Sequence, residues 1–260
     1  MSEKLFPVFF AGHGSPMNII ANNEFSHSLQ KLGENLPKPD AILVISAHWL
    51  TRGTFISTAE KPETIYDFYG FPEALYQIKY PAAGSPETAE KVIRLLGESM
   101  VKRDRGMGLD HGAWAVLHHM YPKADVPVLQ LSLDAEKPSS YHFEMGKKLK
   151  ALRGENILLL GSGNIVHSFR GADFQNEISE PYEWSSSFDK TVENHINNRD
   201  FLPLVDYQKL GQPALLSIPT PDHYWPLLYV LGASDDSDSV SYPFTAIHHK
   251  TMSMRSVLFS

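Results

Sequence analysis

The chain has 260 residues, of which 42% are hydrophobic and 20% charged, a balance typical of a folded globular protein. The formal net charge of −7 gives no general attraction to nucleic acid or to an anionic membrane, and no apolar run approaches the roughly 20 residues that span a bilayer. Cysteine is absent, which excludes disulfides, thiolate metal ligands and a cysteine nucleophile and leads us to expect a cytoplasmic protein.

Two predicted strands near the start of the chain each lead to a histidine. The first, Phe6–Ala11, runs into a glycine-flanked turn that carries His13, and its short apolar run favours a strand over a signal peptide. A helix is predicted over Glu24–Gly33, with its apolar residues on one face. The second strand, Ala41–Trp49, begins with a charge-free apolar run that is typical of a parallel strand buried on both faces, and it carries His48 at its carboxyl end.

The middle of the chain combines short elements with one irregular aromatic stretch. Thr54–Thr58 is a short predicted strand. Ile65–Pro81 contains six aromatic residues among glycine and prolines, which is typical of a loop that covers a site or of a separate hydrophobic cluster. Two helices follow, one over Ser85–Leu96 with its first residue as cap, and one over His111–Tyr121 that Asp110 caps.

The second half of the chain continues the alternation of buried strands and helices. The predicted strands are Val126–Leu133, Asn156–Gly161, Tyr242–His248 and Met254–Phe259, and the predicted helices are Ser139–Leu152, Pro181–Asn197 and one that Thr220 caps with Pro221 at its first position. This pattern predicts an α/β fold, a single domain over residues 1–260 with a central, mainly parallel sheet flanked by helices.

Four histidines occupy comparable positions in this predicted fold. His13, His48 and His167 each follow a buried strand within a few residues, and the carboxyl ends of parallel strands meet at one edge of a sheet. His223 is predicted in the first turn of a helix, where the macrodipole favours the neutral imidazole that a metal needs. Any one of them alone is more often a structural residue, but the four together favour a metal site of imidazole ligands.

The remaining histidines give weaker signals. His111 begins a helix after a glycine-bearing loop, so it is a candidate acid/base or substrate contact, and a surface position is equally compatible with the sequence. His248 and His249 resemble a metal pair, yet adjacent strand residues point to opposite faces, so at most one is expected to reach a shared site. Three further histidines, His27, His142 and His195, are expected on the surface of helices.

Five short motifs in a fixed order give the chain a specific resemblance. They are Ala11-Gly12-His13-Gly14-Ser15-Pro16, Ser46-Ala47-His48-Trp49, Asp110-His111-Gly112-Ala113-Trp114, Gly161-Ser162-Gly163-Asn164-Ile165-Val166-His167 and Pro221-Asp222-His223. As an ordered set they resemble the LigB-type (class III) extradiol ring-cleavage dioxygenases, most closely their 4,5-DOPA dioxygenase branch. The resemblance extends from about residue 6 to the C-terminal strands.

The resemblance implies a non-haem Fe(II) site, which Zn(II) is able to occupy in purified protein. By resemblance His13, His48 and His223 are metal ligands, and His167 matches a fourth site histidine that is both a candidate ligand and a candidate acid/base. His111 matches the histidine that contacts the substrate or O₂, and it is the second candidate catalytic residue. Relatives that cleave protocatechuate have a glutamate where this chain has His223, so the ligand set differs from the usual two-histidine, one-carboxylate triad.

The implied reaction is extradiol opening of a catechol with O₂ to a muconic semialdehyde, such as 4,5-cleavage of 3,4-dihydroxyphenylalanine (DOPA). The implied partners are therefore a small catechol and O₂, with no nucleic acid and no membrane. Arg52, Lys79 and Arg170 are the candidates for holding a substrate carboxylate, and the sequence gives no oligomeric state.

Three other functions fit the same histidines. A zinc hydrolase would use them to activate water, although no glutamate base lies beside a ligand as in a His-Glu-x-x-His helix. A metallochelatase is a second alternative, because the Gly12–Ser15 turn also occurs in that α/β class. The third is a metal-binding interaction protein without activity on a dioxygenase scaffold, which the presence of all five site histidines disfavours.

Overall fold

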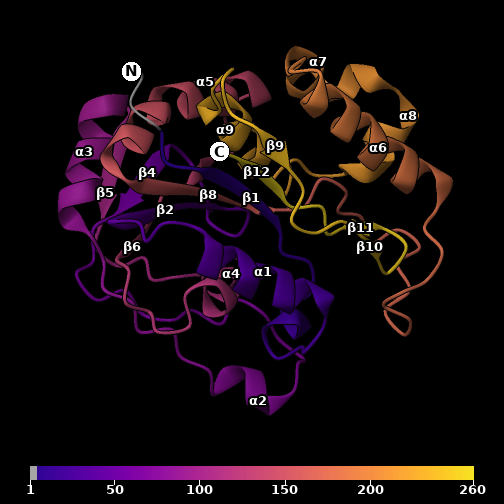
Figure 1. Ribbon diagram of the computed structural model, residues 1–260, viewed down its shortest axis with the longest axis horizontal. Coiled ribbons are helices and arrows are strands. Elements are labelled where there is room, and N and C mark those ends of the chain that lie inside the picture. Colours follow the sequence, from indigo (N-terminus) through magenta and orange to yellow (C-terminus); the bar gives the residue numbers. More distant parts are fainter. Residues whose placement is uncertain (1–4) are drawn as a thin grey trace.

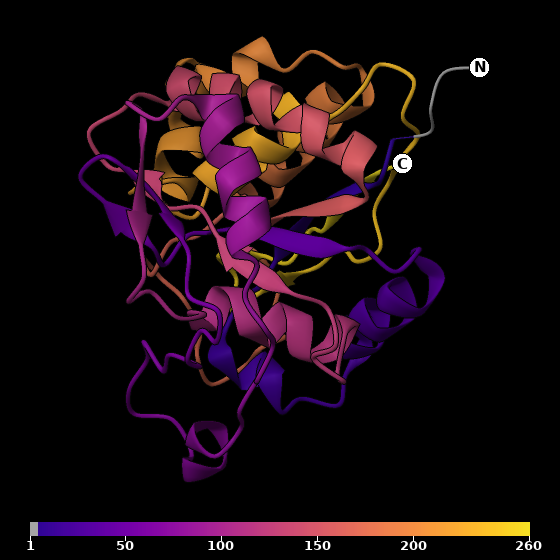
Figure 2. The same ribbon diagram turned by 90° about the vertical axis from the view of Figure 1, so that its left-hand side faces the viewer.

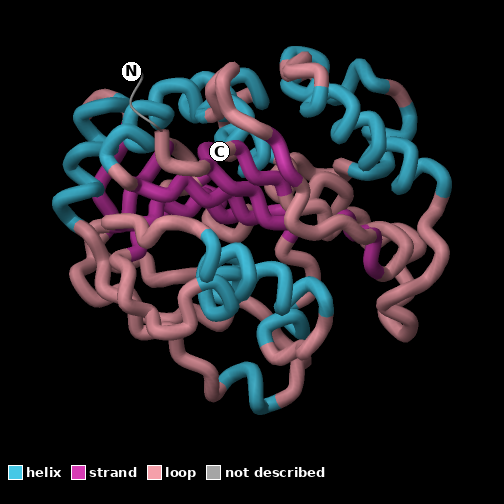
Figure 3. The backbone as a smooth tube through the Cα atoms, viewed as in Figure 1, coloured by secondary structure: helices cyan, strands magenta, loops and turns pink. Residues whose placement is uncertain are grey.

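The computed structural model describes residues 5–260, and residues 1–4 of the predicted domain lie outside the described part. Its centre is a six-stranded sheet in the order β6-β2-β8-β1-β12-β9, which forms the band across the middle of Figures 1 and 3. The strands of this sheet are β6 (Val128–Gln130), β2 (Ala41–Ser46), β8 (Ile157–Gly163), β1 (Val8–Gly12), β12 (Val257–Phe259) and β9 (Val240–Ser241).

The four strands β6, β2, β8 and β1 are parallel, and the last two strands run antiparallel to their neighbours. Every residue of β1, β2 and β8 is buried, because helices cover both faces of the sheet. The predicted α/β class with a central, mainly parallel sheet flanked by helices is therefore confirmed. Among residues 5–260, no helix combines the length and the apolar character that a bilayer crossing requires.

Two layers of helices enclose the sheet, as Figures 1 and 2 show. One face packs on α1 (Glu24–Asn35) and α4 (His111–Met120), and the other on α3 (Pro86–Leu96), α5 (Ser139–Leu149) and α9 (Trp225–Ala233). Successive strand residues point to opposite faces of the sheet. Phe9 therefore packs against the layer of α1 and α4, and its neighbour Phe10 packs against the layer of α3, α5 and α9.

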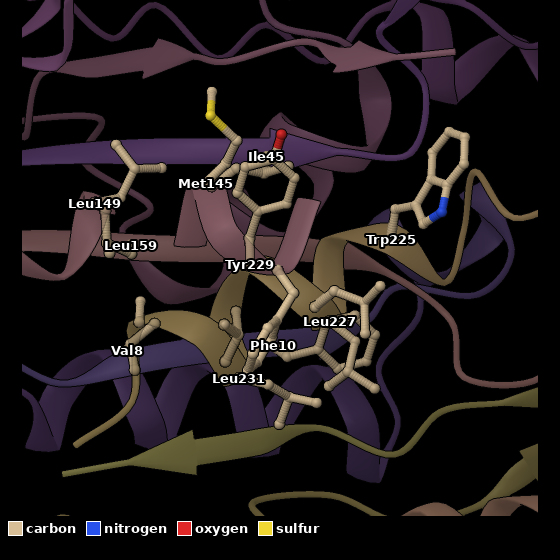
Figure 4. Close-up of a cluster of buried hydrophobic side chains, with 14 of the residues drawn as sticks. Val8, Phe10, Ile45, Met145, Leu149, Leu159, Trp225, Leu227, Tyr229 and Leu231 are labelled. Atoms are coloured by element: carbon tan, nitrogen blue, oxygen red, sulfur yellow. The ribbon is translucent and has the colours of Figure 1, made fainter. Parts of the chain in front are cut away.

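Helix α9 is buried along its whole length between the sheet and α5. Its side chains Leu227, Tyr229 and Leu231 lie among Val8 and Phe10 of β1, as Figure 4 shows. A helix that is apolar all round belongs in a protein interior, and this one anchors the turn that precedes it, which carries His223.

Smaller elements surround this frame. They are the strands β3 (Leu50–Thr51), β4 (Thr54–Ser57), β5 (Val101–Asp104), β7 (Leu133–Asp134), β10 (Ile247–His248) and β11 (Met252–Ser253), and the helices α2 (Glu73–Tyr76), α6 (Glu183–Asn197), α7 (Leu202–Val205) and α8 (Gln212–Ser217). The hairpin of β10 and β11 lies at the right of Figure 1, near the end of β1 from which His13 emerges.

The prediction of a helix that begins at Pro221 is wrong. Helix α9 begins at Trp225, and His223 lies in the tight turn before it. The cause is a second proline, Pro226, which would fall in the interior of the predicted helix and clash with the carbonyl four residues earlier. In the structure it occupies the first turn of α9, where a proline is tolerated.

The prediction of a continuous strand over Tyr242–His248 is also wrong. The chain forms only β9 before this segment and the two-residue β10 at its end. Pro243 lies between them, and a proline lacks the N–H that a strand would donate to its neighbour. The last predicted strand is shorter than expected, because β12 begins only at Val257.

His142, expected on the surface, is fully buried where α5 packs on α9. Its ring stacks on Trp225 with 4.1 Å between ring centroids, and Nδ1 lies 3.3 Å from the Tyr229 hydroxyl. Burial outweighs the opposing effect of Asp134 and lowers the pKa of His142 to about 4, so the imidazole is neutral in the folded protein at pH 7.

The burial of His142 predicts acid-sensitive stability. An unfolded histidine takes up a proton near pH 6.5, whereas the folded one does so only near pH 4. The folded state therefore has its full stability above pH 6.5, and the free energy of unfolding decreases as the pH falls from 6.5 to about 4. Between pH 7 and pH 5 this histidine should cost about 2 kcal/mol of unfolding free energy.

The measurement is denaturant unfolding of the wild type and of His142→Gln at both pH values. The variant should lose about 2 kcal/mol less on going from pH 7 to pH 5, whatever its stability at pH 7. The exposed His27 supplies the control variant, His27→Gln, which should keep the wild-type pH dependence. Equal pH dependence in all three proteins would contradict the prediction.

Candidate metal centre

The carboxyl ends of β1, β8 and β2 meet at one edge of the sheet and position the first histidines. Gly12 of β1 is opposite Gly163 of β8, and Ser162 of β8 is opposite Ser46 of β2. His13 comes directly after β1, His48 two residues after β2, and His167 four residues after β8. The predicted convergence of the strand ends is therefore confirmed.

Two glycines let the chain turn tightly around His13. A Cβ on Gly12 would lie 2.7 Å from the carbonyl carbon of Met254, so only glycine allows this close backbone approach. Gly14 has φ of +63°, a conformation that glycine adopts without strain. The sequence Gly-His-Gly thus folds into the turn that its composition predicts.

His13, His48 and His223 form a group with the spacing of a metal site. Each offers one donor atom, and these atoms all lie within 4.8 Å of one another. The Nε2 atoms of His13 and His48 are 3.2 Å apart, close to the separation of about 3.0–3.4 Å between two ligands that each bind one metal at about 2.0–2.1 Å. The three imidazoles fit a metal ion.

The other ring nitrogen of His13 has a partner that fixes its proton. Its Nδ1 lies 2.9 Å from the Ser162 hydroxyl oxygen, and that hydroxyl donates its own hydrogen to the Gly112 carbonyl at 2.6 Å. The serine oxygen must therefore accept from His13, which places the proton on Nδ1 and leaves the lone pair on Nε2 for a metal.

His223 is arranged in the same way by its neighbour in the chain. Its Nδ1 lies 2.5 Å from Oδ2 of Asp222, so the carboxylate accepts the Nδ1 proton and Nε2 is left as the donor atom. Burial raises the pKa of Asp222, but the hydrogen bond and charge of His223 together with the hydrogen bond from Thr220 lower it further than burial raises it, and the carboxylate is ionised at neutral pH.

Burial also keeps the ligand candidates in the form that binds metal. It lowers the pKa of His13 and of His48 well below the ordinary value of 6.5, and the neighbouring histidines lower both further. The two imidazoles are consequently neutral at pH 7, and a metal ion has no proton to displace from Nε2.

A second group of potential donors overlaps the first at His48. It consists of His48, Asp67 and His111, and Oδ2 of Asp67 lies 2.9 Å from Nδ1 of His111 and 3.6 Å from Nδ1 of His48. His111, which the sequence left equally compatible with the surface, is buried, and its ring centroid is 3.9 Å from that of His48. Sequence reasoning missed Asp67, although it lies within the aromatic stretch singled out as a candidate cover for a site.

His167 stands apart from both donor groups and stacks on His223. The two rings are parallel, with 3.6 Å between their centroids. Burial and then the adjacent His223 lower the pKa of His167 to about 3, so its ring is neutral at pH 7. The structure therefore brings all five predicted site histidines into one cluster, with His167 at its edge.

A cavity of about 1300 Å³ lies at the cluster, and two groups of aromatic residues form parts of its wall. The first wall belongs to the predicted aromatic stretch, where Phe68 lies 5.5 Å from His111 between ring centroids. The second comes from the segment after β8, where Phe169 lies 5.1 Å from His167 and Phe174 lies 5.9 Å from Phe169. No sequence pattern indicated the second wall beyond its position after His167.

Both His248 and His249 line the same cavity, contrary to the expectation that one would point away. The expectation fails because His249 belongs to the turn between β10 and β11 and has φ of +53°, so the strand alternation does not apply to it. Nδ1 of His248 lies 3.0 Å from Glu177, and neither histidine belongs to a donor group among the described residues.

The role of Ser162 gives a prediction about metal affinity. Ser162→Ala should weaken Zn(II) binding about 10- to 100-fold, because Nδ1 of His13 loses the partner that orients the ring. Competition with a chromogenic chelator measures the affinity. The control is Ser185→Ala in α6, a buried serine whose hydroxyl has no partner among the described residues, and its affinity should equal that of the wild type. Equal affinities for both variants would refute the assigned role of Ser162.

Comparison with known proteins gives consistent matches over nearly the full chain. Residues 8–259 match the family model described as the catalytic LigB subunit of aromatic ring-opening dioxygenase. A relative from Escherichia coli (strain K12), named 4,5-DOPA dioxygenase extradiol, is 48% identical over 99% of this chain and 96% of its own length. A protein of the same name from Beta vulgaris is 37% identical over 90% of this chain and 89% of its own length.

A solved structure agrees with these sequence matches. The crystal structure of an uncharacterized protein from Escherichia coli K12 has a TM-score of 0.86 and 44% sequence identity to this chain. The match covers 98% of this chain and 100% of that one.

Proposed function

We propose a substrate and residue roles for this chain, which belongs to the LigB family and is an extradiol dioxygenase that opens an aromatic ring with O₂. The proposed substrate is a catechol with an amino-acid side chain, such as DOPA, cleaved at the 4,5 bond to a muconic semialdehyde. The names of the relatives from Escherichia coli and Beta vulgaris support this choice. The comparisons give no support to a zinc hydrolase or to an inactive scaffold.

The observation that carries the proposal is the cluster of five buried or half-buried imidazoles beneath a cavity with two aromatic walls. A planar catechol ring fits between aromatic walls, because aromatic rings pack favourably edge to face or offset and exclude water. Its two hydroxyl groups would then meet the polar histidine floor.

We propose His13, His48 and His223 as the ligands of the metal, Fe(II) in the active enzyme. When bound, Fe(II) supplies a positive charge that lowers the pKa of the catechol hydroxyl groups and a redox centre for the reaction with O₂. The partners Ser162 and Asp222 hold two of these ligands with Nδ1 protonated and Nε2 available.

His167 and His111 are the proposed groups that move protons. His167 is neutral at pH 7, so one of its ring nitrogens has a free lone pair; because its low pKa makes it a weak base, it would take the hydroxyl proton only where a bound metal makes that hydroxyl more acidic. His111 has Nδ1 against the Asp67 carboxylate, which leaves its Nε2 as the nitrogen that contacts the substrate or O₂. Its position beside Phe68 supports this role, because a catechol ring packed on Phe68 would lie next to the histidine that moves its proton.

Charged side chains at the cavity suit the substituent of an amino-acid substrate. Of the three basic residues proposed for a carboxylate, only Arg170 lines the cavity, whereas Arg52 lies beside Glu136 on the surface. Glu177 also lines the cavity and offers a negative charge to an ammonium group. A guanidinium and a carboxylate at one cavity match the two charges of an amino acid.

Oxygen uptake by the Fe(II)-reconstituted protein tests the reaction. After anaerobic loading, L-DOPA should cause stoichiometric O₂ consumption and a yellow ring-opened product. His13→Ala should abolish turnover together with metal binding, and His167→Ala should abolish turnover while metal stays bound, because the proposal places His167 outside the ligand set. Bound iron without O₂ uptake across a panel of catechols would overturn the proposed reaction.

The carboxylate role of Arg170 predicts a selective loss of substrate affinity. Arg170→Gln should raise KM for L-DOPA about 10-fold or more with little change in kcat, because a charge-assisted hydrogen bond contributes about 1.5–3 kcal/mol. KM for dopamine, which lacks the carboxylate, should stay within about twofold of the wild type. The surface variant Arg52→Gln is the control, and an equal rise in KM for both substrates would disprove the role.

A further inference from the structure

We propose, on the basis of the function above, that Asp67 is a positioning residue that holds His111 and His48 together in their working orientations. Its carboxylate contacts a proposed proton carrier and a proposed metal ligand at the same time. The residue comes from the loop that forms the first aromatic wall, so it also ties that wall to the metal centre.

One oxygen of Asp67 fixes where helix α4 begins. Oδ1 accepts the backbone N–H of His111, the first residue of α4, at 2.8 Å. The cap residue Asp110 accepts the backbone N–H of Ala113 through its own side chain at 3.1 Å. Two of the free N–H groups at this helix start therefore have carboxylate partners, and the backbone of His111 is held from two sides.

The other oxygen of Asp67 acts on the side chains. Oδ2 lies 2.9 Å from Nδ1 of His111, a close contact without the alignment of a full hydrogen bond, and 3.6 Å from Nδ1 of His48. A carboxylate beside Nδ1 favours the proton on that nitrogen. Nε2 of His48 then carries the lone pair, and this is the atom 3.2 Å from Nε2 of His13.

Asp67 completes a pattern that the other proposed ligands share. Ser162 accepts from Nδ1 of His13 and Asp222 accepts from Nδ1 of His223, so each of these ligands has an oxygen partner behind it. For His48 the corresponding oxygen belongs to Asp67 and lies 3.6 Å from Nδ1. Because Asp67 also contacts His111, it is the group that couples the ligand set to the proposed proton carrier.

The loop around Asp67 is attached firmly enough for this role. The backbone N–H of Ile65 donates to the Leu109 carbonyl at 2.8 Å, and the indole of Trp114 in α4 donates to the Ile65 carbonyl at 2.9 Å. On the other side of Asp67, Phe68 packs against the ring of His111. The loop and the start of α4 thus form one unit that holds the carboxylate in place.

Asp67→Asn is the direct test, because asparagine has the same shape and still accepts the His111 backbone N–H. The amide of this variant can donate a hydrogen bond to Nδ1 of His111 or of His48 and so move the ring proton to Nε2. On His48, Nε2 is the nitrogen proposed to bind the metal. We expect one Zn(II) per chain as in the wild type, an affinity lower by about 10- to 100-fold, and kcat for L-DOPA lower by a similar factor with KM changed less.

Asp67→Glu and Asp125→Asn complete the design. The glutamate keeps the charge, so it should recover part of the metal affinity and kcat that asparagine loses, which a purely structural role would not predict. Asp125 is half-exposed and forms an ion pair with Lys38, a residue distant from it in the sequence. Asp125→Asn should therefore have the Zn(II) affinity and the kcat of the wild type. A wild type that is inactive towards catechols would refute only the proposed reaction. The Zn(II) affinities would still test the positioning role of Asp67.

Two results would overturn the proposal. One is wild-type affinity and kcat in Asp67→Asn, which would show that the contact does not position either histidine. The other is two Zn(II) ions per wild-type chain with one lost in Asp67→Asn, because His48, Asp67 and His111 would then be ligands of a second metal.

Discussion

The register of three parallel strands determines where every other part of the site lies. Because β8 pairs with both β1 and β2 and all three end within one residue of each other, the loops that carry His13, His48 and His167 begin at the same edge of the sheet. Helices bury both faces of these strands, so a shift of register would expose apolar side chains along each of them. The same burial that stabilises the fold therefore fixes the separation of the histidines.

Burial of several imidazoles close together keeps them neutral, so the surrounding groups determine which ring nitrogen carries the proton. Burial and mutual repulsion keep His13, His48 and His167 neutral, and a neutral imidazole must place its one proton on one of two nitrogens. Oxygen atoms of Ser162, Asp222 and Asp67 lie beside Nδ1 of the ligand candidates. Without them each ring could rotate or carry its proton on the wrong side, and the cluster would have no defined set of donor atoms.

The parts of the site that depend on local pattern were predictable from the sequence. The buried strands, the glycine turn around His13 and the cap Asp110 before His111 each follow from a few neighbouring residues. The turn around His223 was misplaced because two prolines compete for the helix start, and only packing along α9 decides between them. Phe169 and Asp67 were missed because their roles depend on contacts between segments far apart in the chain.

The aromatic loop contributes both to the wall of the cavity and to the positioning of the histidines. Phe68 forms part of the wall against which a catechol would pack, and Asp67 beside it in the chain contacts His111 and His48. Phe68 lines the cavity whereas Asp67 does not, and both residues contact His111. If Asp67 holds His111 as proposed, a substrate that displaced Phe68 would also displace the carboxylate from His111. The packing of a substrate on Phe68 and the proton position on His111 would then depend on two adjacent residues of one loop.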